Sequence, residues 1–132
     1  MAQGSSRPLS PHLSVYRKLD TMVMSGFHRI TGFCLAIGTL HLTCWFLSAA
    51  AGPEAFNAIQ AFSRSWFGML MLFGWTFCLF YHLANGVRHL IWDVGMSFEI
   101  KNIVSGGWFA TAIAVGLTVV TWIAGLASLG LK

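Results

Sequence analysis

The chain has 132 residues, of which 56% are hydrophobic and only 9% are charged. Ordinary globular domains contain roughly 45–50% apolar and 25% charged residues, and a small domain needs charges to cover its surface. The composition excludes a soluble domain and a disordered chain, and it disfavours a nucleic-acid binder because the eight Lys and Arg residues are scattered. A membrane protein remains.

The first twenty residues are polar and contain no apolar core of their own. They are not a secretory signal, because the first apolar stretch begins late and continues into a membrane span. They are also short and only weakly basic for a mitochondrial transit peptide, which favours a bacterial cytoplasmic (inner) membrane over the mitochondrial inner membrane. We expect residues 1–20 to form a polar N-terminal segment and residues 21–132 to form the membrane anchor.

Three long segments contain no Lys, Arg, Asp or Glu: residues 30–53, 65–87 and 102–131. Each reaches the ~20 apolar residues needed to cross ~30 Å of hydrocarbon. Three buried helices filling over half of so short a chain would have nothing to bury them in a soluble protein. The sequence therefore predicts an all-α membrane protein with three transmembrane helices, at about residues 22–50, 65–92 and 104–130. A short outer connection with a helical turn is expected over residues 54–64.

Basic residues are distributed unevenly between the two sides of such a bundle. With three spans, the N-terminal segment and the connection between the second and third spans share one side of the membrane. That side holds six basic residues, namely Arg7, Arg17, Lys18, Arg29, Arg88 and Lys101, whereas the other side holds Arg64 and Lys132. The positive-inside rule places the N-terminus on the cytoplasmic side.

Polar residues inside a membrane span are costly and therefore mark candidate sites. On the second span, His82, Gly86 and His89 are spaced to lie on one helical face. This stripe presents an imidazole, a gap for a bulky planar ligand and a second imidazole about 10 Å away along the axis. The pattern favours ligation of a haem iron by His82, with positive charge from Arg88 near the propionates. The alternative is that His82 hydrogen-bonds to another helix and stabilises the bundle.

On the first span, Ser25, His28, Arg29 and Gly32 share one face. The first helix enters the bilayer on the side where the second leaves it, so these donors reach about the membrane level of His89. Donors that converge at one interface suit a carbonyl-bearing or anionic ligand. Ordinary snorkelling of Arg29 to lipid phosphates, with Ser25 as a packing residue, is an equal alternative on these residues alone.

The remaining polar and thiol groups of the spans are interpreted as packing residues. His41 lies about 18 Å along the helix from Arg29, so it is at a different depth from His82 and is poorly placed to bind the same iron. A six-coordinate haem held by His82 would then need its second ligand from another chain. The spacing of Cys34, Cys44 and Cys78 matches no metal motif.

Three motifs resemble one family over nearly the whole chain. They are residues 7–13, the string S-x-x-H-R-x-T-G at residues 25–32, and the string H-x-x-x-G-x-R-H-x-x-W-D at residues 82–93. Together they are similar to the cytochrome b membrane-anchor subunit of succinate dehydrogenase (succinate:quinone oxidoreductase, respiratory complex II).

The resemblance implies a role for each matching residue. His82 would be an axial ligand of the haem b iron, with His28, Arg29 and His89 near the haem propionates. Ser25 and Arg29 would contribute to a ubiquinone site. A second small anchor subunit would supply the other axial histidine, and the two anchors would hold an iron–sulfur subunit and a flavoprotein subunit. The chain would be an enzyme subunit that is not catalytic alone and that helps pass electrons from succinate to quinone.

Two other functions compete with this interpretation. One is the anchor subunit of a fumarate reductase, which runs the reaction in the opposite direction. The other is a non-redox membrane scaffold or transporter subunit that uses its polar residues only for helix contacts.

Overall fold

The computed structural model describes residues 19–130, which form four helices and no strands in that part of the chain. They are α1 (Asp20–Ala51), α2 (Pro53–Arg64), α3 (Trp66–Asp93) and α4 (Ile100–Gly130). Three of them are long and apolar enough to cross a membrane: α1, α3 and residues Ile100–Ser128 of α4. The predicted all-α fold with three membrane-spanning helices is confirmed. The N-terminal motif at residues 7–13 lies outside the described residues, as does most of the predicted N-terminal segment.

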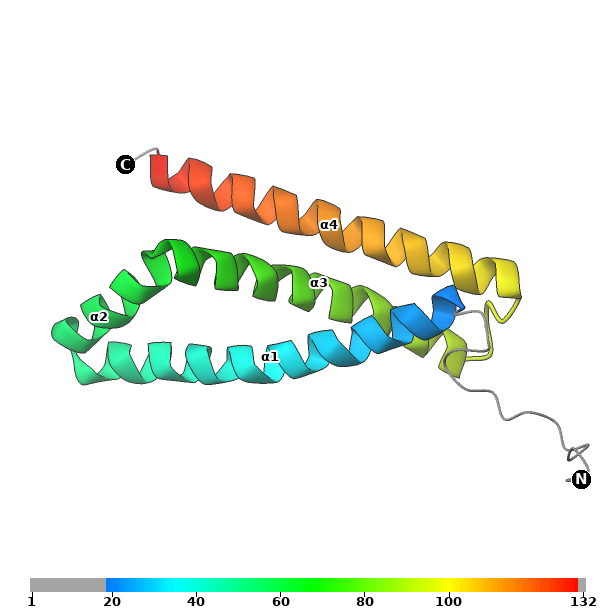
Figure 1. The fold of residues 1–132 in the computed structure, drawn as a ribbon, viewed down its shortest axis with the longest axis horizontal. Helices are drawn as coiled ribbons and strands as arrows, with labels where there is room; N and C mark the ends of the chain where they lie inside the picture. The colour runs from blue at the N-terminus through cyan, green and yellow to red at the C-terminus, as the bar shows by residue number, and fades with distance from the viewer. Residues whose placement is uncertain (1–18, 131–132) are drawn as a thin grey trace, which may run out of the picture.

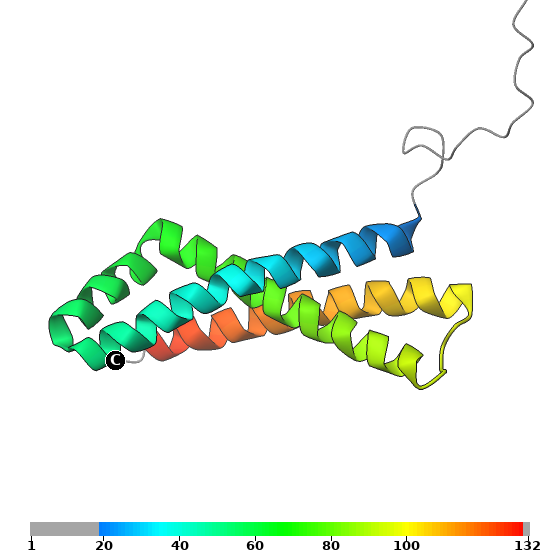
Figure 2. The ribbon, with the colours of Figure 1, turned by 90° about the horizontal axis from the view of Figure 1, so that it is seen from below.

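The three long helices are antiparallel to one another in chain order, and α3 lies between α1 and α4 (Figure 1). Helix α3 packs against α4 and against α1, whereas α1 and α4 touch much less. The helices cross at an angle in the perpendicular view (Figure 2). We call the end of the bundle that holds the connection of residues 94–99 the loop end, and the opposite end the α2 end. A side chain of α3 that packs inside the bundle therefore contacts α1 on one side or α4 on the other.

The breaks between helices follow from individual residues. Helix α1 ends at Gly52, whose φ of 120° is strained for any side chain, and Pro53 then occupies the first turn of α2. The predicted outer connection is a full 12-residue helix rather than a single turn. Its polar residues Glu54, Asn57 and Arg64 are exposed, while Ser63 is buried against the bundle.

Capping residues define both ends of α3. The Ser65 hydroxyl accepts a hydrogen bond from the Gly68 amide at 3.1 Å, which caps the first turn. At the other end Gly95 has a φ of 82°, and the amides of Gly95 and Met96 donate to the carbonyls of Trp92 and Ile91. This pair of hydrogen bonds is a Schellman motif, which requires the left-handed conformation that glycine adopts without strain.

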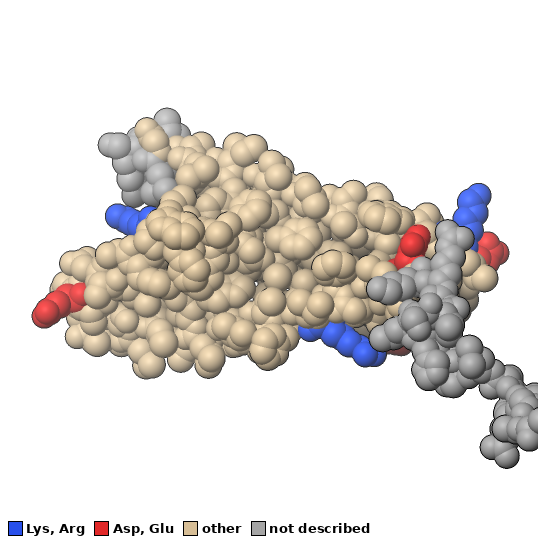
Figure 3. Space-filling model, in the orientation of Figure 1, with Lys and Arg blue, Asp and Glu red and all other residues tan. Residues whose placement is uncertain are grey.

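The packing is typical of a helix bundle in a lipid bilayer. Large apolar side chains cover the outside, and the charged groups visible in Figure 3 lie toward the two ends of the molecule. Apart from Met24 and Tyr81, the buried side chains are small or polar. Ala110, Ala114 and Thr118 form a seam on α4 at helical spacing, and Asn85 is 2% exposed on α3. In hydrocarbon, small residues let helix backbones approach closely and polar residues find partners on neighbouring helices.

Candidate functional site

The ring of His82 is held by the backbone of α1. Its Nδ1 lies 3.0 Å from the carbonyl oxygen of His28 and 3.3 Å from the hydroxyl of Thr31. The Thr31 hydroxyl itself donates to the same carbonyl at 2.8 Å, so neither neighbour has a proton to give to His82. In the neutral imidazole Nδ1 therefore carries the proton and donates it to the carbonyl. Nε2 then has no proton, and its lone pair is available to bind a metal.

A glycine on α1 makes room for this ring. A Cβ placed on Gly32 would lie 3.0 Å from Cε1 of His82 and 3.5 Å from Nδ1. The rings of His82 and His28 stack with their centroids 3.9 Å apart and their planes within 8° of each other. The imidazole is thus fixed by contacts from α1, and its neighbour Gly86 has open space where a Cβ would stand.

Several of the predicted site residues line one small polar cavity at the loop end, between α1 and α3. The cavity has a volume of about 140 Å³ and is lined by Thr21, Met24, Ser25, His28, Asn85, Arg88, His89 and Trp92. The rings of His28 and His89 lie 5.2 Å apart between centroids. Nδ1 of His28 is buried and has no hydrogen-bond partner among residues 19–130. The structure therefore brings Ser25, His28 and His89 together, as the shared membrane level predicted.

Two of the predicted site residues, Arg29 and His82, do not line this cavity. Arg29 stands apart from it. It is exposed on α1, next to His28 in sequence. Neighbouring residues on a helix point about 100° apart, so Arg29 faces the outside of the bundle. Ser25 is also exposed and lies four residues before Arg29, so a ligand on this face of α1 can contact both side chains.

Arg88 lines the polar cavity and forms hydrogen bonds to α3 and α4. Its guanidinium donates to Oδ1 of Asn85 at 2.7 Å and to the carbonyl oxygen of Ile103 at 2.9 Å. It also stands 4.5 Å from the centroid of the Trp92 ring. These contacts link α3 to α4, and Arg88 also lines the polar cavity with His28 and His89. Its role as a positive charge near a propionate stays a prediction.

His41 lies near the α2 end, apart from the other histidines. Its Nε2 is 3.3 Å from the hydroxyl of Ser63, and its ring packs near Phe62 and Trp75. The Ser63 hydroxyl gives its proton to the carbonyl of Ile59 at 2.8 Å, so it accepts from His41. These contacts agree with the interpretation of His41 as a polar packing residue.

The donor set fits a b-type haem better than a bare metal ion. Among residues 19–130 the structure forms no group of three or more His, Cys, Asp or Glu side chains placed to hold a metal ion. A b-type haem would need only one histidine nitrogen from this chain, because the porphyrin itself supplies most of the ligands of the iron. A histidine whose Nδ1 donates to a backbone carbonyl, with Nε2 free, is the usual form of such a ligand.

A sequence model of the family described as "Succinate dehydrogenase/Fumarate reductase transmembrane subunit" matches residues 3–121. The chain belongs to this family. Its relatives include a succinate dehydrogenase cytochrome b556 subunit from Paracoccus denitrificans, which is 40% identical over 118 residues covering 89% of this chain and 91% of the relative.

Cytochrome b560 subunits of succinate dehydrogenase are among the relatives as well. A cytochrome b560 subunit of Reclinomonas americana is 36% identical, covering 89% of this chain and 85% of the relative. The mitochondrial cytochrome b560 subunit of Sus scrofa is 38% identical, covering 79% of this chain and 63% of the relative. Membership in the succinate dehydrogenase family identifies the chain as a multi-pass membrane-anchor subunit of an oxidoreductase complex, and it disfavours a non-redox scaffold.

Two residues of the site were not assigned roles from the sequence. Thr31 follows His28 by three residues, so helical spacing alone places both beside the same partner. Asn85 is nearly fully buried and bonds both to the Tyr81 carbonyl and to Arg88. Because a buried amide inside a membrane span needs partners, Asn85 could have been singled out by the argument that was applied to the histidines.

Proposed function

We propose that this subunit binds haem b through Nε2 of His82 and helps to form a ubiquinone-reduction site at the loop end. The observation that carries the proposal is the 3.0 Å contact between Nδ1 of His82 and the carbonyl oxygen of His28. Because a carbonyl only accepts, this contact assigns the proton of the neutral imidazole to Nδ1. An imidazole held in this tautomer inside a membrane span has its lone pair on Nε2, ready for a ligand that the bundle itself does not supply. When bound, a b-type haem supplies one-electron redox chemistry.

His28 and His89 would lie near the haem propionates. Both line the polar cavity on the side of α3 that carries His82. The buried, unpartnered Nδ1 of His28 is a polar atom that a carboxylate would satisfy. Arg29 would add a positive charge from the adjoining surface of α1. The second axial histidine would come from a second small membrane-anchor subunit, because His41 lies at the other end of the bundle.

Ser25 and Arg29 would serve the quinone. Reduction of a quinone to a quinol takes up two electrons and two protons, and negative charge builds on its oxygens between the electron and proton transfers. The Ser25 hydroxyl would donate a hydrogen bond to one quinone carbonyl, and Arg29 would stabilise the developing charge. The electrons would arrive from an iron–sulfur subunit, which in turn would receive them from a flavoprotein that oxidises succinate.

The remaining predictions describe the setting of the subunit. We propose the bacterial cytoplasmic membrane as its location, with the N-terminus on the cytoplasmic side. Residues 1–20 would form a polar segment ahead of the anchor formed by residues 21–132. The loop end, which carries the polar cavity, would then face the iron–sulfur and flavoprotein subunits.

The substitution His82→Gln in the assembled complex tests the ligand assignment. We expect the b-type band in the reduced-minus-oxidised spectrum to disappear or shift, because glutamine cannot supply the imidazole nitrogen. Co-purification of the flavin-containing and iron–sulfur polypeptides would show that the complex still assembles.

His41→Gln is the matched control, since it changes the other intramembrane histidine and retains a hydrogen-bonding group for Ser63. Its spectrum should equal that of the wild type. A His82→Gln complex with a normal b-type spectrum would overturn the assignment.

A further inference from the structure

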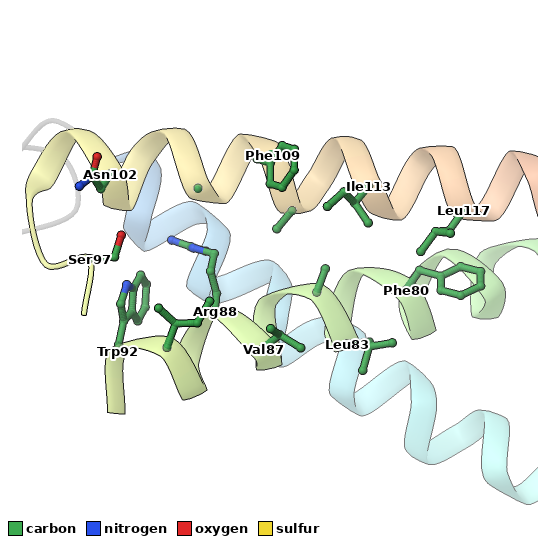
Figure 4. Close-up of a pocket in the computed structure, with 14 residues that line it drawn as sticks. Phe80, Leu83, Val87, Arg88, Trp92, Ser97, Asn102, Phe109, Ile113 and Leu117 are labelled. Atoms are coloured by element: carbon green, nitrogen blue, oxygen red, sulfur yellow. The ribbon is translucent and has the colours of Figure 1, made fainter. Parts of the chain in front are cut away.

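A second cavity lies between α3 and α4. It differs from the polar cavity in volume and in most of its lining. Its volume is about 410 Å³. Most of its lining is apolar: Phe80, Leu83, Ala84, Val87, Ile91, Phe109, Ala110, Ile113 and Leu117, with Gly106 beside them. Several of these side chains are about half exposed, so the cavity is an open groove on the outside of the bundle. Figure 4 shows the groove between the two helices.

The loop end of this groove is polar. Arg88, Trp92, Ser97 and Asn102 stand together there, as Figure 4 shows, while the apolar side chains extend toward the middle of the helices. Arg88 uses two of its five N–H donors on Asn85 and Ile103. The Trp92 indole, the Ser97 hydroxyl and the Asn102 amide have no hydrogen-bond partner among residues 19–130.

Arg88 is the charged side chain that lines this end of the groove. No acidic side chain lines the groove, and Arg88 pairs with no carboxylate in the described part of the chain. Asp93, Glu99 and Lys101 belong to the adjoining connection and helix start, and none of them lines the groove either. An arginine without a counter-ion at a membrane surface favours an anionic partner.

The dimensions fit one lipid chain. Asn102 and Leu117 are separated by fifteen residues, or about 22 Å along α4. That exceeds the ~15 Å of hydrocarbon in one leaflet, so a whole acyl chain can lie in the groove with its headgroup at the polar end. At 100° per residue, the α3 residues that line the groove lie on the side of the helix roughly opposite His82. A subunit that faces His82 would therefore leave this groove to the bilayer.

We propose that the groove between α3 and α4 binds an anionic phospholipid. One acyl chain lies along Phe109, Ile113 and Leu117, and the phosphate accepts hydrogen bonds from the free donors at the loop end. The proposal uses none of the histidines. Arg88 and Trp92 line both this groove and the polar cavity, so the variants that test the proposal change neither of them.

The test measures lipid binding to the purified complex after a detergent wash. Phosphatidylglycerol or phosphatidylcholine is added back, and bound phospholipid per complex is measured by mass spectrometry. We expect phosphatidylglycerol to bind about tenfold more tightly, which corresponds to about 1.4 kcal/mol. The double variant Ser97→Gly, Asn102→Leu should remove that preference, and glycine at position 97 also suits the φ of 66° found there.

A second variant addresses the apolar part. Ala84→Leu fills the groove and should abolish binding of either lipid, whereas Ala112→Leu on the exposed side of α4 should not. Asn57→Leu at the α2 end is the matched control for Asn102→Leu. If the Ala84→Leu complex does not assemble, the double variant Ser97→Gly, Asn102→Leu still tests the proposal. Equal binding of both lipids to the wild type, unchanged binding in both variants, or recovery of an isoprenoid or a polypeptide in place of phospholipid would overturn the proposal.

Discussion

At the residue scale, the position of a single proton decides what His82 can bind. A histidine that gives its Nδ1 proton to a backbone carbonyl is held in orientation and is made more basic at Nε2. Here the carbonyl belongs to His28, whose own side chain stacks on the same ring. One residue of α1 thus orients the proposed ligand through its backbone and shields it with its side chain.

Gly32 provides a test of how closely this ring is confined. In Gly32→Ala the new Cβ would lie 3.0 Å from Cε1 of His82, so the ring must tilt. A tilted ring costs about 1 kcal/mol, which we expect to lower haem affinity about fivefold. The measurement is haem content and the b-type spectrum of the purified complex. Gly26→Ala on the same helix places its Cβ in open space and should leave both unchanged; equal behaviour of the two variants would contradict the argument.

Ser25 should matter for quinone and not for haem. In Ser25→Ala, loss of one hydrogen bond worth about 1.4 kcal/mol should lower kcat/KM for quinone reduction about tenfold. The b-type spectrum and the reduction of a water-soluble dye by succinate should be retained. Ser48→Ala on the same helix, near the α2 end, is the control. Normal quinone turnover in Ser25→Ala would remove this residue from the site.

The residue-level predictions succeeded where helical spacing was sufficient. The spacing of His82, Gly86 and His89 defines a face, and antiparallel connection of the first two spans places Ser25 and His28 at its level. The bond between His82 and the His28 carbonyl could not be predicted, because it depends on how α1 and α3 are rotated about their axes. Arg88 was assigned by its position next to His89, although neighbours on a helix point about 100° apart.

At the element scale, the junction of three helices depends on Gly107. This residue is buried on α4, and a Cβ there would collide with Sδ of Met24 on α1 and lie 3.5 Å from Cζ of Arg88 on α3. The glycine therefore allows side chains from both other helices to rest on the backbone of α4. Arg88 uses the same closeness to reach the Ile103 carbonyl.

Gly107→Ala should consequently destabilise the bundle by about 1–3 kcal/mol, the usual cost of overpacking. Thermal unfolding of the detergent-solubilised complex measures this effect. Adding Met24→Ala should restore part of the loss, because it removes the atoms that the new Cβ meets. Gly116→Ala on the same helix meets no atom within 4 Å and should be neutral. A neutral Gly107→Ala would show that the helices can separate at no cost.

Sequence reasoning predicted the long elements better than the short one. Absence of charge over ~20 residues is a physical requirement of a membrane span, so the three long helices were predictable with small errors at their ends. For residues 54–64 the sequence predicted a short connection with a helical turn, after residues 51–53 end the first span. The polar residues of α2 are in fact distributed on one side of a helix that starts at Pro53 and ends at Arg64.

At the scale of the whole molecule, the bundle has a polar interior and an apolar exterior. Asn85, Thr31, Ser63 and Thr118 are buried, while leucine, phenylalanine and isoleucine side chains are exposed along all three long helices. Such a surface is stable only in lipid or against other membrane subunits. The two ends differ in their basic residues, however. The loop end carries Arg29, Arg88 and Lys101 beside Asp20, Asp93 and Glu99, and the α2 end carries Arg64 beside Glu54.

This asymmetry predicts the orientation of the subunit in the membrane. The loop end should be cytoplasmic, because basic residues are retained on that side during insertion. We expect Asn57→Cys in α2 to react with a membrane-impermeant maleimide in intact bacterial spheroplasts, and Glu99→Cys in the connection between α3 and α4 to react only after permeabilisation. The native Cys34, Cys44 and Cys78 lie within the apolar spans, so the unmodified chain measures the background. The opposite labelling pattern would place the polar cavity on the outer side, away from subunits that deliver electrons from the cytoplasm.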